Sequence, residues 1–374
     1  MELFFDLVYV FAFTQLSELL YEHLTWQAAG ETAVILVALW LSWNYTAWAT
    51  GWVDPDRTPV VLLLSVLMIA SLVMATAILD AFDGRGEAFA IAYVVMQLLR
   101  SGFMVWVFGP RQPMGRNYAR LFIWSVLSGA IWILGGTVAD PHARLLVWAV
   151  AAAVDLAAPM IGFRLPLAGA TQMSDWKIAG GHLAERSQLL LMIAFGESFL
   201  RIGESFALEH GTVAADTAFL VGFVLVFSLW TIYFLHHAGS ALHTLEQARE
   251  DAARLARSAY MYAHAAMIGA VVVISDVIHL TIESPREPVS AGFAAICVGG
   301  PCLYLIGIAF SKRWLGHGGV ERMLLGSLAL AAAGAATAFS TRLTELIAVT
   351  VVSIAISLTV QRSDSPRTGS QVEG

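Results

Sequence analysis

Acidic and basic side chains share one face of an apolar segment that spans residues 185–207. On a helix with 3.6 residues per turn, the charged residues of that stripe are Arg186, Glu197, Arg201 and Glu204. Glu197 lies 11 residues past Arg186, a rise of roughly 16 Å, or about half of a bilayer's hydrocarbon core. A charge at that depth costs at least ~2.5 kcal/mol unless it faces protein or water. Glu197 is therefore the first candidate for binding a proton or cation; the alternative is a structural pair with Arg201, one turn on.

Four further polar side chains interrupt apolar segments: Asp6, Gln15, Arg100 and Asp155. Gln15 aligns with Glu197 when the first segment is laid over the seventh, which suggests one site between two halves. Asp6 could equally be a helix-start acid, and Gln15 a residue that bonds to a neighbouring helix. Neither Arg100 nor Asp155 can face lipid alone, so each needs a partner. Arg100 could pair with Glu197 or with Asp155, and a structural role explains such pairs as well as a functional one.

His264, close to Tyr260 and Tyr262, is either a satisfied core group or part of a proton relay. Asp80 and Asp276 fall at the outer ends of their segments, and we interpret them as acids at the interface between membrane and water. The sequence has no histidine–carboxylate spacing typical of a metal site, no phosphate-binding loop and no nucleophile–base pair. We therefore expect no metal, no cofactor, no catalytic residue and no enzymatic activity.

Composition identifies the class of protein. The 374 residues are 58% hydrophobic and 13% charged, with a mean hydropathy of +0.71. Soluble domains carry about twice that fraction of charge. Repeated apolar runs of about 20 residues predict an all-α, polytopic integral membrane protein whose main partner is the lipid bilayer. No basic arm or zinc spacing points to nucleic acid.

Turn residues separate twelve apolar runs, which we take as transmembrane helices. The predicted spans are 2–22, 29–50, 58–80, 87–108, 118–138, 142–163, 185–207, 216–238, 257–280, 289–311, 320–340 and 343–361. One set of alternate loops, with the C-terminal tail, holds fifteen Lys and Arg residues, and the other set holds five. The positive-inside rule then places both termini in the cytoplasm.

Weak internal similarity predicts two six-helix pseudo-repeats in the same orientation. Residues 11–15 resemble residues 193–197, and Ile78–Asp80 resembles Ile274–Asp276. We expect a first half over 1–165, a cytoplasmic connecting loop over 166–184, a second half over 185–362 and a disordered tail over 363–374.

Several of these segments resemble the bacterial low temperature requirement A family. The matching motifs are Glu2–Ser17, Asp155–Pro159, His182–Arg186 (which contains Glu185), Phe195–Ser198 and Tyr262–His264, in the family's order. One departure follows Arg186, where the family often has Phe-Gly and this chain has Ser-Gln. The resemblance implies a bacterial inner-membrane protein linked by name to growth in the cold, and adds Glu185 and Arg186 to the candidate site.

A mid-membrane carboxylate, an internal repeat and the lack of a nucleotide loop together favour a secondary transporter of a small solute, coupled to a proton or cation. The alternatives are a cation channel, and a membrane sensor or enzyme without a transport role. A homo-oligomer is compatible with each of them.

Overall fold

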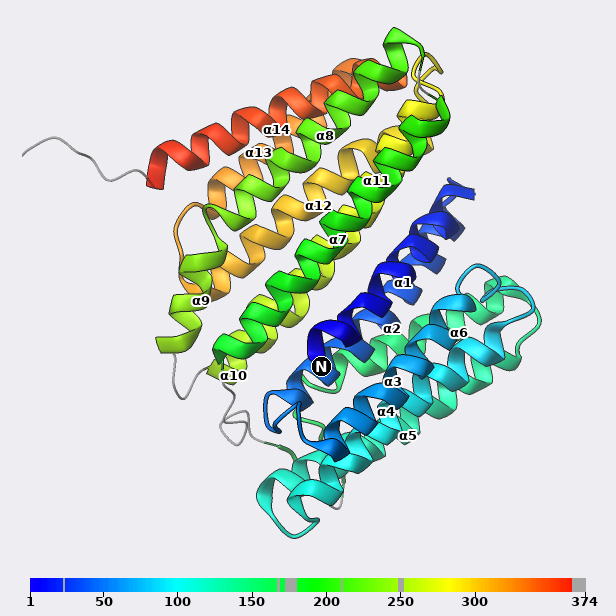
Figure 1. Ribbon diagram of the computed structural model, residues 1–374, viewed down its shortest axis with the longest axis vertical. Coiled ribbons are helices and arrows are strands. Elements are labelled where there is room, and N and C mark those ends of the chain that lie inside the picture. Colours follow the sequence, from blue (N-terminus) through cyan, green and yellow to red (C-terminus); the bar gives the residue numbers. More distant parts are fainter. Residues whose placement is uncertain (23, 167–168, 172–179, 210, 248–251, 365–374) are drawn as a thin grey trace, which may run out of the picture.

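The computed structural model describes residues 1–364 except 23, 167–168, 172–179, 210 and 248–251 (Figure 1). Most of the expected disordered tail, from residue 365 onward, lies outside the described residues, as does much of the expected connecting loop. Within the described part of the chain there are helices but no β-strand, only isolated bridges between Leu165 and Gly169 and between Pro288 and Thr341.

Twelve long helices form the described fold. They are α1 (Glu2–Glu22), α2 (Trp26–Thr50), α3 (Thr58–Thr76), α4 (Gly86–Phe108), α5 (Pro113–Thr137), α6 (Pro141–Ala157), α7 (Gly180–Glu209), α8 (Val213–Phe234), α11 (Ala263–Glu283), α12 (Ala291–Leu315), α13 (Val320–Thr337) and α14 (Arg342–Asp364). Ten helical segments are long and apolar enough to cross a membrane; α6, at 17 residues, and the charged α7 are not among them. The prediction of an all-α polytopic membrane protein is confirmed.

Local sequence explains where several helices begin. Thr25, Asp140, Thr212 and Ser290 each precede a helix, and each side-chain oxygen accepts from the backbone N–H three residues on. Such caps satisfy N–H groups that have no partner inside the helix.

Several helix boundaries differ from the sequence prediction by a few residues, including the end of α6 and the start of α7. Helix α6 ends at Ala157 rather than near residue 163, because Pro159 cannot donate the next helical hydrogen bond. Helix α7 starts at Gly180, so the end of the expected connecting loop is helical. Two short helices were missed, α9 (Ala238–Gln247) and α10 (Ala252–Leu255). The π-helix η3 (Ala256–Tyr262), which leads directly into α11, falls almost wholly within the predicted span 257–280, but its π-helical geometry was not predicted.

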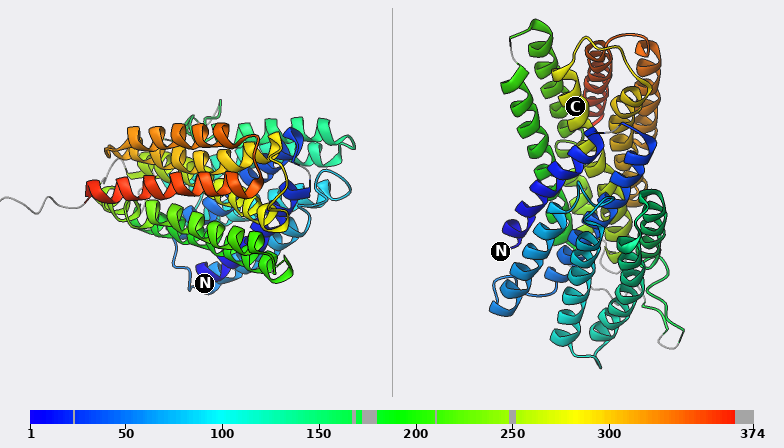
Figure 2. Two further views of the ribbon diagram at one scale, coloured as in Figure 1. Left: turned by 90° about the horizontal axis from the view of Figure 1, so that it is seen from above. Right: turned by 90° about the vertical axis from the view of Figure 1, so that its right-hand side faces the viewer.

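The helices fall into two groups in space, α1–α6 and α7–α14, and α1 lies where the groups meet (Figures 1 and 2). In the first group α1 contacts α2 and α3, α2 contacts α4 and α6, and α3 to α6 pack in chain order. The second group repeats this scheme with α7, α8, α11, α12, α13 and α14 in the same roles. Two six-helix repeats would pack in this way; the repeat itself stays a prediction.

The two groups meet through α1 and α2 on one side and α7 and α11 on the other. α2 and α11 are the most thoroughly buried of the ten segments able to span a membrane. Large apolar side chains such as Leu62, Ile69 and Leu325 point outward, as expected of helices that face lipid. The start of α1, the short α9 and α10, and the end of α14 lie toward the same end of the bundle (Figure 1).

Candidate functional site

Helices α1 and α7 run in the same direction, with acidic residues of one against arginines of the other. Glu2 and Asp6 meet Arg186, and Glu18 meets Arg201. Glu2 and Glu18 are 16 residues apart, a rise of roughly 24 Å along the helix. The two arginine contacts therefore lie near opposite ends of one interface between the two halves.

The first contact is a dense ion cluster near the start of α1. The Arg186 guanidinium lies 2.6 Å from Asp6 Oδ1 and 3.0 Å from Glu2 Oε1. Trp43 of α2 donates its indole N–H to the same Asp6 oxygen (2.7 Å), and His182 lies 3.1 Å from Glu2. Asp6 is completely buried, so this carboxylate depends on these donors for the stabilisation that water would otherwise give.

The second contact is centred on Arg201, toward the other end of the interface. Its guanidinium lies 3.0 Å from a Glu18 oxygen and 3.7 Å from Asp276 Oδ1 of α11. Ser17 donates its hydroxyl to the same Asp276 oxygen. Asp276 is completely buried, so the expectation of an interfacial acid was wrong there; Asp80, by contrast, is exposed.

Glu197 lies one helical turn before Arg201, at the same interface. Only 1% of this residue's surface is exposed, and neither carboxylate oxygen has a hydrogen-bonding partner among the described residues. Thr14 of α1 and Ser275 of α11 interact with its carboxylate, without a well-formed hydrogen bond. Arg201 attracts the Glu197 carboxylate electrostatically, but its close contacts among the described residues are with Glu18 and Asp276.

The balance of charges around Arg201 limits which carboxylates of this part of the interface can be ionised together. Arg201 is one cation facing three carboxylates, those of Glu18, Asp276 and Glu197. With all three ionised, the group carries two excess negative charges in a largely buried place, which is strongly unfavourable. Protons or monovalent cations would remove that excess. No set of three His, Cys, Asp or Glu side chains placed to hold a metal ion occurs in the described part of the chain.

Asp155 and Arg100 lie inside the first half, and neither contacts Glu197 in the structure. Asp155 Oδ2 accepts from the Tyr93 hydroxyl (2.8 Å) and the Trp132 indole N–H (2.9 Å). Arg100 is fully buried and donates to the Ser42 carbonyl oxygen, to Thr46 and to Gln97.

The remaining candidates are dispersed. Gln15 is partly buried on α1, next to Thr14, and Glu185 is exposed on α7. His264 is buried at the start of α11, where it shares a 2.6 Å hydrogen bond with the Tyr233 hydroxyl and stacks on Tyr260. Of the predicted site residues, the interface between the halves thus brings Asp6 together with Arg186, while Glu197 and Arg201 lie one turn apart on α7 at the same interface.

Sequence reasoning missed four groups of this interface: Glu2, Glu18, Ser275 and Asp276. A signal for the first two was present, because Glu2 lies one turn before Asp6 on α1 and Glu18 lies one turn after Thr14. No such signal marks Ser275 or Asp276. Their role depends on α11 packing against both α1 and α7, which only the tertiary structure reveals.

Comparison with known proteins supports one family. Residues 1–358 match the family described as "Bacterial low temperature requirement A protein (LtrA)". An uncharacterized protein of Rhizobium meliloti (strain 1021) is 35% identical over 315 residues, which cover 83% of this chain and 76% of that protein. No solved structure matches the chain.

Proposed function

Since this chain belongs to the bacterial low temperature requirement A family of multi-pass membrane proteins, we propose that it is a secondary transporter of the inner membrane, moving a small solute in exchange for, or together with, a proton or monovalent cation. Glu197 is the coupling site in this proposal. Arg201, Glu18 and Asp276 set the charge around it.

One observation carries the proposal: a buried carboxylate with no well-formed hydrogen bond to any described residue, at the interface between the two halves. An ionised carboxylate so placed is unstable, whereas a protonated or cation-bound one is not. The neighbouring hydroxyls of Thr14 and Ser275 can hydrogen-bond a carboxylic acid or supply oxygen ligands to a small cation. Binding and release of the ion would therefore change the energy of this interface.

The ion pairs at the two ends of α1 and α7 suggest how ion binding at Glu197 could drive a conformational change. Rocking of one half against the other would open the contact of Arg186 with Asp6 at one end, or that of Arg201 with Glu18 at the other. Both contacts are formed in this structure. Alternating access requires that one barrier stay closed while the other opens, and one ion pair at each end supplies two such barriers.

The test needs no knowledge of the solute. Purified protein is reconstituted in liposomes on a solid-supported membrane, and the current is recorded after a jump in proton or sodium concentration. We expect a transient, saturable current in the wild type, its loss in Glu197→Gln, and its retention in Glu209→Gln, which alters an exposed acid of the same helix.

Two results would overturn the proposal. A full transient current in Glu197→Gln would show that the coupling site lies elsewhere, and a steady ohmic current under voltage would identify the cation channel instead. If Glu197→Gln does not fold, Ser275→Ala and Thr14→Val test the same site, because each removes a hydroxyl beside the carboxylate while leaving the acid in place.

A further inference from the structure

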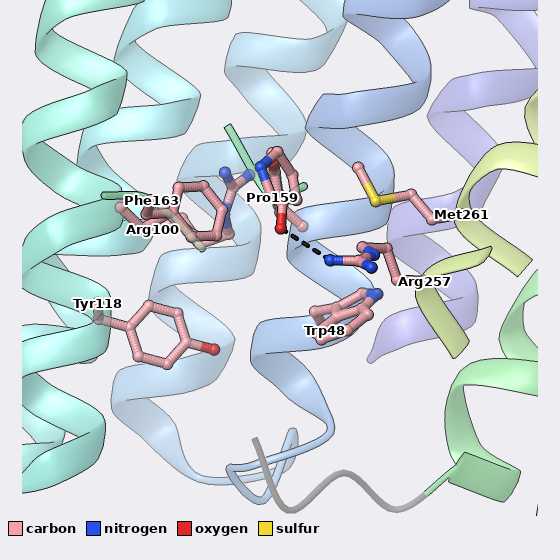
Figure 3. Close-up of a pocket in the computed structure, with 9 residues that line it drawn as sticks. Trp48, Arg100, Tyr118, Pro159, Phe163, Arg257 and Met261 are labelled. Carbon is pink, nitrogen blue, oxygen red and sulfur yellow. Dashed lines mark hydrogen bonds between the residues drawn. The ribbon is translucent and has the colours of Figure 1, made fainter. Parts of the chain in front are cut away.

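A second hollow, whose exposed lining is mostly apolar, lies where the two halves meet, away from Glu197. It is a cavity of about 30 Å³ whose walls include Tyr45, Tyr118, Pro159 and Phe163, together with the two arginines Arg100 and Arg257 (Figure 3). Helices α2, α4 and α5 and the turn after α6 supply the first-half walls, and the π-helix η3 supplies Arg257. Both halves thus contribute to the walls of the cavity.

Arg100 is a fully buried cation that contacts no carboxylate among the described residues. Its guanidinium donates to neutral acceptors only, the Ser42 carbonyl oxygen at 3.2 Å, the Thr46 hydroxyl at 3.3 Å and the Gln97 side-chain oxygen. Its Nε–H has no partner in the described chain, and the guanidinium carbon lies 5.3 Å from the centre of the Tyr45 ring. A buried charge held by neutral groups alone remains costly.

Arg257 approaches the same cavity from the second half. It donates to the Pro159 carbonyl oxygen at 2.8 Å (Figure 3), and its Nε–H has no partner among the described residues. The turn that presents Pro159 is tight: Gly162 has φ of 62°, and Phe163 has φ of 50°, a left-handed conformation that is unfavourable for a bulky residue. Strained turns and π-helical segments are both common at functional sites.

Among the described residues, the local charge is positive. Asp155 is the acid that interacts with Arg100 here, over a longer range, and its Oδ2 oxygen is already engaged by Tyr93 and Trp132. With Asp155 ionised, two arginines still leave one positive charge in excess. A single monovalent anion would balance that charge.

The volume of the cavity limits the size of the anion that it can hold. A cavity that takes benzene measures about 150 Å³, several times the space found here, so an organic anion with an aromatic body does not fit. We propose that this cavity binds one small inorganic anion, of the size of chloride or nitrate, between Arg100 and Arg257. Aromatic rings suit such a site, because their edges carry partial positive charge. An anion at this site would contact both halves of the protein, and its binding does not depend on Glu197 being the coupling site.

The first test is the thermal unfolding of the purified protein in sodium chloride and in sodium gluconate at equal ionic strength, since gluconate is too large for the cavity. We expect chloride to raise the melting temperature saturably in the wild type. Arg257→Gln should raise the half-saturating chloride concentration about tenfold or more, because it removes one charged donor. Arg116→Gln, which alters an exposed arginine of α5, should behave like the wild type.

The second test locates the ion. Crystals grown in sodium bromide should give an anomalous peak between the Arg100 and Arg257 guanidinium groups, and this requires no variant to fold. Equal melting temperatures in chloride and gluconate together with no peak would overturn the proposal. So would a chloride effect that Arg257→Gln and Arg116→Gln share equally, because the effect would then arise from ions at the protein surface.

Discussion

Replacing Arg186 with Gln should show that the ion cluster on α1 and α7 is a coupled unit. The substitution leaves Asp6, which is completely buried, with the Trp43 indole N–H as its remaining charge-stabilising donor. Removing one partner of a buried ion pair typically costs about 3–5 kcal/mol, because the other charge stays buried without compensation. We expect Arg186→Gln to lower the free energy of unfolding by that amount.

A double-mutant cycle tests the reason for the loss. Asp6→Asn keeps an oxygen that can accept from Trp43 and leaves Arg186 with Glu2, so it should cost less, about 1–2 kcal/mol. In the double variant no ionised Asp6 is left behind. The combined loss should therefore be smaller than the sum of the single losses by about 1–3 kcal/mol.

The measurement is tryptophan fluorescence during denaturant unfolding in mixed micelles. Arg57→Gln is the control, because Arg57 and Asp54 form an exposed pair at 3.8 Å that should contribute at most about 1 kcal/mol. Losses that add within about 0.5 kcal/mol would refute the coupling between Asp6 and Arg186 on which this reasoning depends.

Two further variants test other parts of the fold. A Cβ added to Gly222 of α8 would lie 2.4 Å from a methyl carbon of Ile278 of α11, so Gly222→Ala should lower the free energy of unfolding by about 1–3 kcal/mol, whereas Gly299→Ala, which meets nothing within 4 Å, should not. Partial burial and nearby Lys312 lower the pKa of His317 in the loop before α13. The folded state then favours the neutral imidazole of His317 more than the unfolded state does. The stability that depends on this neutral side chain is present above about pH 6.5 and is lost as the pH falls below that value. His317→Gln should remove that component of acid sensitivity, and equal pH dependence of wild type and variant in unfolding experiments would contradict the assignment.

The sequence by itself determined the class of protein and most helix positions. Twelve apolar runs predict the twelve long helices because a membrane-spanning segment must satisfy its backbone hydrogen bonds internally and present apolar side chains for about 20 residues. Both constraints act within a single segment, so residue patterns such as those of α1 and α12 are enough to locate the helices. Glu197 could be singled out for the same reason, since its depth follows from counting residues along one helix.

The tertiary structure alone decided which polar groups meet. Arg201 could have paired with Glu197 on its own helix, but α1 and α11 bring Glu18 and Asp276 to it, and Glu197 is left without a well-formed hydrogen bond to any described residue. Likewise, Arg100 and Arg257 are 157 positions apart in the sequence and line one cavity only because the turn at Pro159 lies against η3. Electrostatic pairing depends on distances of a few ångströms between different helices, and helix periodicity does not encode them.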